Sequence, residues 1–451
     1  MKTKWFFFAS IFFLLLLVFQ CKKQEPRRVV KPSAPSLSAG KIYPNLPYLS
    51  QGGATFALYL PKQYTPQKAW PVVYFFDAHA RGILPVKRYR KLADDFGFIF
   101  VGANNLKNGL ANQTIANRVD NLFGEVNNRF KIRKNQQYIM GFSGGARMAV
   151  LTALLRSDVS GVIGCAAGFP QWRQPISRSF AYVAVVGKGD FNLSELQVLN
   201  VQLDRSPLPH WLIEFTGGHE WPPMYITRKA FSLLQLDAIR NGFARSEPNF
   251  LGRFVKSEMQ IIDSLKQDNK LLALGEEYRL LINALKGMGA IQSVEIAYKK
   301  LIKSKAYLKQ KNQEREQALR EVDLQKSIQK AFKRQDIAYL QKQYRKLSRI
   351  KAGQTDYWMA KRLIAFTSLL GYLYAQQALQ KKDLAAAEAY LKLYAVTDKN
   401  NADRYYLQAW LDILQGKLSQ AQQEAEKALR LGLDDRQKIF ANPDFSVLQL
   451  H

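Results

Sequence analysis

The sequence has few cysteines, few histidines and few acidic residues. Its 451 residues include 2 cysteines and 4 histidines, and 36 acidic residues stand against 66 lysines and arginines. It has no zinc-finger spacing, no histidine pair at ligand spacing and no phosphate-binding loop, so no metal ion and no organic cofactor is implied. The shortage of acids leaves a formal net charge of +30, which bears on solubility and acidic neighbours but not on the fold.

Nucleic acid is the first partner to consider for so basic a chain. The sequence lacks an aromatic RNA-binding signature and a localised basic arm, and its lysines and arginines are spread over both halves. We therefore expect no nucleic-acid partner. Anionic lipid headgroups, or acidic polymers of a cell envelope, suit the amino-terminal end better.

Residues 1–21 have the composition of an export signal. Two lysines precede about fifteen mostly apolar residues, fewer than the roughly twenty that span a bilayer comfortably. The apolar run meets Cys21, as in a bacterial lipoprotein whose cysteine is acylated after cleavage, although Phe19 and Gln20 stand where small residues are usual. Plain secretion and an uncleaved anchor are the alternatives, and the basic residues beyond Cys21 oppose export of an uncleaved anchor. We expect a cell-envelope protein held by a lipid on Cys21, at the periplasmic or outer-membrane face.

The length of the chain and its 47% apolar content predict two folded domains. Residues 22–45 are polar and rich in proline, so we expect a flexible linker there. Residues 46–245 alternate short apolar runs with helical stretches, which predicts a mostly parallel sheet with helices on both faces. The expected strands are nearly continuously apolar, as strands buried on both faces should be; they are residues 56–60, 71–76, 98–102, 137–140, 162–166, 181–186 and 210–215.

Residues 246–451 show no further strand signal. They are rich in Leu, Ala, Lys, Gln and Glu, with apolar residues at helical spacing, and they predict an all-α domain. Near its end, Asp383-Leu384 is followed 34 residues later by Lys417-Leu418. A helix–turn–helix period of 34 residues is that of tetratricopeptide repeats, so we expect a repeat-like domain with a concave face for a protein partner.

The most informative motif is residues 141–145, Gly-Phe-Ser-Gly-Gly. It fits the Gly-x-Ser-x-Gly nucleophile elbow, a sharp turn between a strand and a helix. The strand expected at residues 137–140 precedes it, and residues 146–155, which can form a helix, follow it. A Cβ at position 141 or 145 would collide with the neighbouring strand or helix, which accounts for the two glycines. Ser143 is therefore the candidate nucleophile, and an ordinary glycine-rich turn is the alternative.

A serine hydroxyl needs a base to take its proton, and a nucleophile elbow predicts the chain order serine, acid, histidine. Three histidines follow Ser143. His210 opens a strand and His451 lies outside the domain, whereas His219 lies behind two glycines in a loop that follows an apolar strand. We expect His219 to be the base.

The acid that orients the imidazole should follow an intervening strand. Asp190 follows the strand expected at residues 181–186 by a few residues and is our candidate. Asp204 and Glu195 are weaker alternatives.

An oxyanion hole needs backbone N–H groups that face the developing negative charge. The residue after the nucleophile, Gly144, supplies one by geometry. We expect the second within residues 78–81, where His79 is the candidate to line the site. His79 could equally only brace the loop, and Asp77 before it is expected to be structural.

These motifs resemble the α/β-hydrolase superfamily. The elbow, residues 187–192 (Gly-Lys-Gly-Asp-Phe-Asn) and residues 217–223 (Gly-Gly-His-Glu-Trp-Pro-Pro) look most like its esterases related to feruloyl esterases and polyhydroxybutyrate depolymerases. The resemblance covers residues 46–245 and implies an α/β-hydrolase fold with a serine esterase triad. The chain departs from many relatives at His79-Ala80, where they carry His-Gly. It also lacks a large insertion that could form a lid, so we expect an open site for bulky or polysaccharide-linked esters.

Loops at the carboxyl ends of the strands should build the substrate pocket. Asn105, Trp172 and Trp221 fall there, and the tryptophans could stack on a sugar or an aromatic acyl group or merely pack a loop. The expected function is that of an exported serine esterase. The alternatives are an envelope scaffold that binds through its helical repeats, and a serine peptidase of the same fold, because a triad serves esters and amides alike.

Overall fold

The computed structural model describes residues 37–50, 52–172, 176, 179–245, 249–289, 291–433, 439 and 442–449. The expected export signal with Cys21, the first part of the expected linker, and His451 lie outside the described residues. Within the described part of the chain, no helix is both long and apolar enough to cross a membrane.

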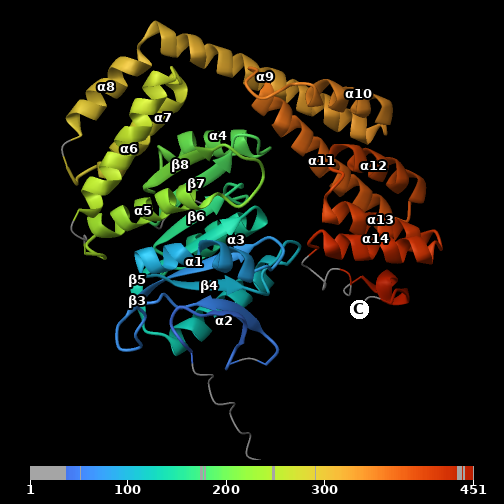
Figure 1. Ribbon diagram of the computed structural model, residues 1–451, viewed down its shortest axis with the longest axis horizontal. Coiled ribbons are helices and arrows are strands. Elements are labelled where there is room, and N and C mark those ends of the chain that lie inside the picture. The colour runs from blue at the N-terminus through green and yellow to red at the C-terminus, as the bar shows by residue number, and fades with distance from the viewer. Residues whose placement is uncertain are drawn as a thin grey trace, which may run out of the picture. The chain divides into compact units, whose positions relative to one another are not determined.

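An eight-stranded sheet organises the first half of the described chain (Figure 1). In space its strands follow the order β1-β2-β4-β3-β5-β6-β7-β8. β2 pairs antiparallel with β1 and β4, and every other neighbouring pair is parallel. The strands are β1 (Ile42–Pro47), β2 (Thr55–Tyr59), β3 (Trp70–Asp77), β4 (Ile99–Ala103), β5 (Ile132–Phe142), β6 (Gly161–Cys165), β7 (Ala181–Gly187) and β8 (His210–Phe215).

Helices cover both faces of this sheet, because its central strands are apolar on both sides. Every residue of β3, β4, β6 and β7 is buried. One hydrophobic core joins one face to α1 and α5, and a second joins the opposite face to α2, α3 and α4. The helices are α1 (Ile83–Phe96), α2 (Asn112–Arg129), α3 (Gly144–Leu155), α4 (Leu193–Leu203) and α5 (Met224–Arg240).

This strand order, with its one antiparallel strand inside a parallel sheet and helices on both faces, is the fold of the α/β hydrolases. The fold class expected from the sequence is therefore confirmed. Each of the seven expected strands has a counterpart in the sheet, and the structure adds β1 before them.

β1 lies where the sequence predicted a flexible linker. Residues 42–47 pair antiparallel with β2, so the linker expected over residues 22–45 is wrong for its last residues. The pairing register shifts between Tyr43 and Leu46, and Pro44, which has no N–H to donate, lies inside that irregularity. A proline at a bulge in an edge strand breaks the alternating pattern by which strands are recognised in a sequence.

The rest of the described chain is helical. The helices are α6 (Phe250–Gln267), α7 (Leu271–Leu285), α8 (Gln292–Ile302), α9 (Lys305–Lys333), α10 (Ile337–Ser348), α11 (Tyr357–Gln380), α12 (Leu384–Thr397), α13 (Ala402–Leu414) and α14 (Leu418–Arg430), followed by a 3₁₀ turn, η1 (Pro443–Val447). Residues of α6 and α7, among them Phe254 and Leu281, share a hydrophobic core with α5 of the sheet region. A separate core holds the end of α9 together with α10 to α14.

The 34-residue echo in the sequence coincides with helix starts. α12 begins at Leu384 and α14 begins at Leu418, and each packs against the helix before it. The helices before them differ in length, because α11 has 24 residues and α13 has 13. The two helix pairs therefore have second helices of similar length, α12 and α14, but first helices of different length.

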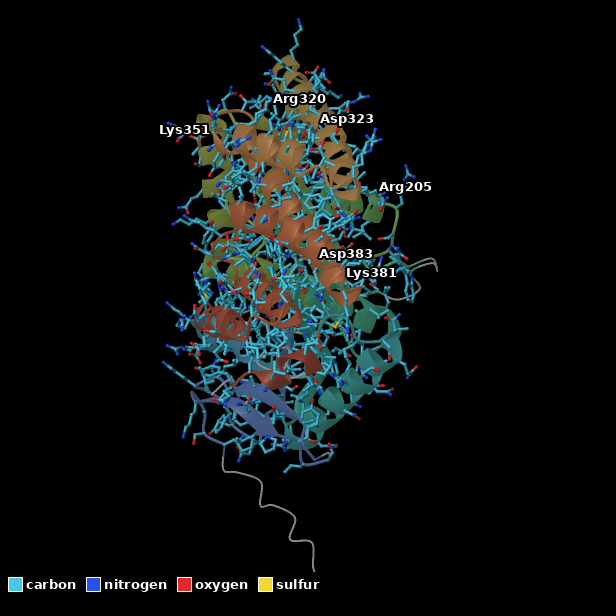
Figure 2. All side chains as sticks on the ribbon, turned by 90° about the vertical axis from the view of Figure 1, so that its right-hand side faces the viewer. Arg205, Arg320, Asp323, Lys351, Lys381 and Asp383 are labelled. Atoms are coloured by element: carbon cyan, nitrogen blue, oxygen red, sulfur yellow. The ribbon has the colours of Figure 1, made fainter. Side chains whose placement is uncertain are left out.

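Charged side chains cover the surface of this helical region. Arg320 and Asp323 of α9, and Lys351 after α10, are exposed (Figure 2). Charge on exposed side chains is solvated, so it costs the fold little.

Candidate active site

Ser143 lies at a strained turn between β5 and α3. Its backbone angles are φ 54° and ψ −121°, a region that non-glycine residues rarely adopt and that costs of the order of 1–3 kcal/mol. A Cβ at Gly141 would lie 2.2 Å from the carbonyl oxygen of Gly145, and a Cβ at Gly145 would lie 2.0 Å from that of Phe76. The two glycines are thus required by close backbone approach, as the motif predicts.

A continuous hydrogen-bond chain starts at this serine. His219 Nε2 lies 3.0 Å from Ser143 Oγ, and His219 Nδ1 lies 3.0 Å from Asp190 Oδ2. Asp190 is fully buried, and the His219 side chain is 22% exposed. A carboxylate can only accept a hydrogen bond, so it selects the tautomer with the proton on Nδ1 and leaves Nε2 to accept from the serine hydroxyl.

The loops that carry the acid and the histidine are bonded to each other. The Lys188 N–H donates to the Phe215 carbonyl at 2.8 Å, and the Gly189 N–H donates to the Gly217 carbonyl at 2.8 Å. The second oxygen of Asp190 accepts from the Asn192 N–H at 2.8 Å. Asp190 is therefore held on one oxygen by backbone and presents the other to the imidazole.

The weaker candidates for acid and base lie elsewhere. Asp204 pairs with Arg279 at 2.6 Å and with His210 at 3.2 Å. Glu195 pairs with Arg147 at 2.9 Å and accepts from the Gly168 N–H. The structure brings none of these groups to Ser143.

The Gly144 N–H is suitably placed to donate to an oxyanion. Gly144 is the first residue of α3, where backbone N–H groups have no acceptor within the helix. No hydrogen bond engages this N–H within the described residues. The amide of Asn108 lies directly over Gly144, since a Cβ there would come within 1.7 Å of Asn108 Oδ1.

The second expected oxyanion donor is engaged elsewhere. The backbone N–H of His79 donates to Asp77 Oδ1 at 2.8 Å, so the expectation that His79 supplies the second N–H is wrong for this arrangement of the loop. Ala80 has a φ of 61° and donates its N–H to the Asp77 carbonyl. Asp77 thus accepts from two N–H groups of this loop, one through its carboxylate and one through its backbone carbonyl.

Asp77 is an anion buried beneath the site. It accepts hydrogen bonds from Arg81 Nε at 2.8 Å, from Arg81 Nη2 at 3.0 Å and from the Trp221 indole at 3.0 Å, besides that from His79. Burial acts to raise the pKa of Asp77, but these donors and the charge of Arg81 outweigh it and lower the pKa below its ordinary value. Asp77 therefore links the loop after β3 to the loop that carries His219.

The three residues expected to bind substrate have other surroundings. Trp221 is 4% exposed, stacks on Phe142 and donates its indole N–H to Asp77, so it is a core residue and the prediction was wrong. Trp172 is half-buried and packs against the core that contains α2, α3 and α4. Asn105 lies against the Tyr48 hydroxyl, and its Oδ1 is buried.

Two residues near Ser143 and His219 were not singled out from the sequence. Phe191 stacks on the His219 ring with 4.5 Å between ring centroids, and Asn108 lies over Gly144. Phe191 directly follows the acid, and Asn108 belongs to the loop from which Asn105 was chosen. Position in the chain could have indicated both, but only the structure shows which side chains turn towards the site.

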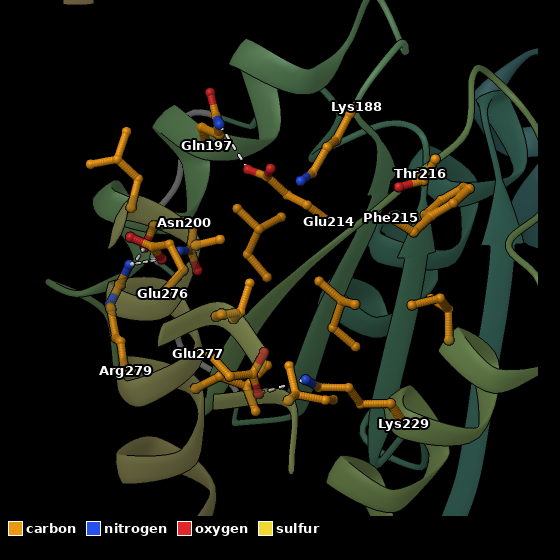
Figure 3. Close-up of a pocket in the computed structure, with 18 of the residues that line it drawn as sticks. Lys188, Gln197, Asn200, Glu214, Phe215, Thr216, Lys229, Glu276, Glu277 and Arg279 are labelled. Atoms are coloured by element: carbon orange, nitrogen blue, oxygen red, sulfur yellow. Dashed lines mark hydrogen bonds and ion pairs between the residues drawn. The ribbon is translucent and has the colours of Figure 1, made fainter. Parts of the chain in front are cut away.

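A large cavity lies next to Lys188, at the start of the loop that carries Asp190. Its volume is about 1260 Å³, and residues of α4 to α7, α9, α11 and β8 line it, whereas Ser143 and His219 do not. Figure 3 shows Lys188, Glu214 and Lys229 projecting into it. Lys229 pairs there with Glu258 at 2.6 Å and with Glu277 at 2.7 Å.

Within the described residues, no group of three or more His, Cys, Asp or Glu side chains is arranged to hold a metal ion. The groups placed for chemistry are the serine, the imidazole, the buried carboxylate and the N–H at the start of α3. Together they can deliver an alkoxide to an electrophilic carbon and stabilise the charge that develops next to it.

No protein-family model matches the chain, and no curated protein sequence matches it. Solved structures similar to it include the S-formylglutathione hydrolase of Staphylococcus aureus, at 15% identity over 40% of this chain and 90% of that one, with a TM-score of 0.34. The feruloyl esterase module of Clostridium thermocellum matches at 14% identity over 40% and 81%, with a TM-score of 0.33. The Bacillus cereus carboxylesterase matches at 16% identity over 41% and 95%, with a TM-score of 0.34.

Proposed function

We propose that the protein is a serine hydrolase that cleaves carboxylic esters. The observation that carries this proposal is the unbroken hydrogen-bond chain from Ser143 through His219 to the buried Asp190. A turn without a function would require neither the aligned imidazole nor the strained backbone of the serine. The arrangement supplies a candidate for the nucleophile, for its base and for the group that orients the base.

In the proposed reaction, His219 Nε2 takes the proton of Ser143 as its Oγ attacks the ester carbonyl carbon. Asp190 accepts from Nδ1–H and stabilises the imidazolium that forms. The Gly144 N–H donates to the oxyanion of the tetrahedral intermediate. His219 then gives the proton to the leaving alcohol, and a water molecule activated by the same imidazole hydrolyses the acyl-serine.

Labelling with a fluorophosphonate tests the nucleophile. The full-length chain is treated with the probe and the labelled residue is mapped, alongside Ser143→Ala and His219→Ala. Ser194→Ala, which removes a serine from the first turn of α4, is the matched control and should label like the wild type. Labelling at Ser143 that is lost in the first two variants supports the proposal, and a folded wild type that takes no label contradicts it.

The choice of an ester over an amide rests on the resemblance of the three sequence motifs to esterases. Bulky or polysaccharide-linked esters are proposed because the sequence has no insertion that could form a lid. Acetyl, feruloyl and short-chain esters should be compared with amides of the same acyl groups. Amide turnover that disappears in Ser143→Ala would favour the peptidase alternative.

We also propose export to the cell envelope with a lipid on Cys21, which the apolar run before this cysteine supports. Cys21→Ala should then move the protein from the membrane fraction to the soluble fraction. If both forms fractionate alike, the anchor proposal fails.

We propose that the helical region is tetratricopeptide-like and offers a surface to a protein partner. The 34-residue spacing of the α12 and α14 starts supports this. If the protein were a scaffold instead of an enzyme, Ser143→Ala would leave partner binding unchanged and no ester turnover would be found in the wild type.

A further inference from the structure

The helical region reaches the loop that carries the catalytic acid. Arg362 of α11 donates from Nη1 to the carbonyl oxygen of Lys188 at 2.8 Å, two residues before Asp190. Its Nε and Nη2 donate to Glu321 of α9 at 2.8 and 2.6 Å. Arg362 is 8% exposed and Glu321 is 3% exposed, so both charges are buried together.

α11 also packs directly against the turn beside the acid. A Cβ at Gly189 would lie 3.3 Å from the Cβ of Lys361 and 3.4 Å from the Cε3 of Trp358. On its other side the same Cβ would lie 3.1 Å from the carbonyl oxygen of Gly217, in the histidine loop. Residues 188–190 are therefore enclosed between α11 and the loop that carries His219.

We propose that Arg362, held in place by Glu321, is a positioning residue for Asp190 and through it for His219. This inference rests on the proposed function, because it assigns a role relative to the triad. The helical region then contributes to the active site by fixing the acid loop, in addition to any partner it binds.

The geometry favours a guanidinium for this role. One edge of its planar fork meets the carboxylate while the remaining nitrogen meets the carbonyl, which the single ammonium of lysine cannot reproduce. The 1260 Å³ cavity lies beside the acid loop, and Lys188 (Figure 3) and Arg362 are both among its lining residues.

A buried ion pair is by itself weak evidence for a stabilising role, because desolvation can cancel the attraction between the charges. The double variant Glu321→Leu/Arg362→Met replaces the pair by apolar groups and leaves no unpaired charge. It should keep its Tm within a few degrees and lose only the bond to the Lys188 carbonyl. The double variant therefore separates positioning from folding.

The test measures kcat, KM, the pH profile and Tm of the full-length wild type, of the double variant and of Arg362→Lys. We expect kcat to fall roughly tenfold to a hundredfold in the double variant with KM within twofold, since a displacement of about 1 Å costs that much. We expect an intermediate loss in Arg362→Lys. The acidic limb of the pH profile should move to lower pH, because an imidazole that is poorly supported by Asp190 is harder to charge.

Arg240→Met is the matched control. Arg240 of α5 also donates to backbone carbonyls across the two regions, to Lys286 at 3.1 Å and to Asn283 at 3.3 Å, but it is not bonded to the acid loop. Its kcat and pH profile should equal those of the wild type. A folded double variant with unchanged kcat and pH profile overturns the inference, as does an equal loss of activity in Arg240→Met. A wild type without fluorophosphonate labelling or ester turnover would instead overturn the proposed function, and the inference with it.

Discussion

Two fully buried aspartates lie at the carboxyl ends of strands, Asp77 as the last residue of β3 and Asp190 in the loop after β7, and the two carboxylates are bonded differently. Asp77 accepts from the permanently charged Arg81, from an indole and from a backbone N–H. Asp190 accepts from one backbone N–H and from His219. Asp77 is compensated in every state of the protein, whereas the cation next to Asp190 forms only when the histidine takes a proton.

This difference separates a structural anion from the one proposed to be catalytic. An interaction accelerates a reaction only if it is stronger in the transition state than in the ground state. The Asp190–His219 contact gains strength as the imidazole becomes charged, while the Asp77–Arg81 contact does not change. Replacing either carboxylate by its amide should therefore damage different properties of the molecule.

The largest effect is expected for Asp190→Asn. The amide can donate to Nδ1 and so favours the wrong tautomer of His219, and we expect kcat to fall about 10⁴-fold. Tm should change by only a few degrees, because the amide oxygen can still accept from the Asn192 N–H. Steady-state kinetics and thermal unfolding measure both.

Asp204→Asn is the matched control for the acid, because Asp204 was the other aspartate weighed for the role and is paired with Arg279 and His210 instead. It should keep kcat within about threefold. If Asp204→Asn were the inactive variant and Asp190→Asn the active one, the assignment of the acid would be refuted.

The next largest effect is expected for Asp77→Asn, on stability. Removing this charge leaves the Arg81 guanidinium beside a buried amide, and we expect a loss of about 3 kcal/mol in the free energy of unfolding. kcat should fall by less than tenfold, because Asp77 touches the site only through Trp221 and the loop after β3. Denaturant unfolding measures the free energy of unfolding. Asp120→Asn is the control, because Asp120 is an exposed partner of Arg156, and this variant should lose no more than about 0.5 kcal/mol.

The stability that Asp77 supplies should disappear in acid. Its pKa is lowered in the folded protein, so the contribution is fully present above the unfolded pKa of about 4 and is lost as the pH falls through the folded pKa. The difference in Tm between wild type and Asp77→Asn should therefore be constant from pH 7 to pH 5 and shrink below pH 4. A difference that stays constant down to pH 3 would show that the amide acts through shape and not through charge.

Some features of the fold and of the candidate site could be predicted from the sequence, and others could not. Ser143, Asp190 and His219 could be expected to meet because each follows a strand at its carboxyl end, and such ends lie at one edge of a parallel sheet. Strands such as β3 were recognisable because burial on both faces makes them apolar throughout. β1 was not, because its pattern is broken by Pro44.

The direction in which a side chain points could not be predicted from the sequence. Trp221 was expected at the substrate pocket and lies in the core, because the buried Asp77 provides an acceptor for its indole. His79 was expected to offer its N–H to an oxyanion, and the same carboxylate accepts it. Arg362 lies more than 170 residues from the loop that it contacts, and no local pattern marks such a pair.

A third buried carboxylate, Glu258, differs from Asp77 because its pKa is raised and not lowered. It pairs with Lys229, but it shares that cation with Glu277. Burial raises the pKa of Glu258 to about 8 and the nearby Glu277 acts in the same direction, while Lys229 lowers it. Asp77 accepts hydrogen bonds from several donors, whereas Glu258 shares its cation with Glu277. This accounts for the opposite directions of their pKa shifts.

The smallest effect is therefore expected for Glu258→Gln, and it depends on pH. A carboxyl group whose folded pKa is raised binds more protons in the folded state between about pH 4.5 and pH 8, so the wild type loses stability as the pH rises through this window. Glu258→Gln should gain about 1 kcal/mol relative to the wild type from pH 5 to pH 8, a modest amount because Lys229 and Glu277 share the charge. Unfolding at both pH values measures it, with the exposed Glu316→Gln as a control that should show no such gain. A gain that appears instead below pH 4 would mean that Glu258 behaves like Asp77, and that sharing a cation does not distinguish the two.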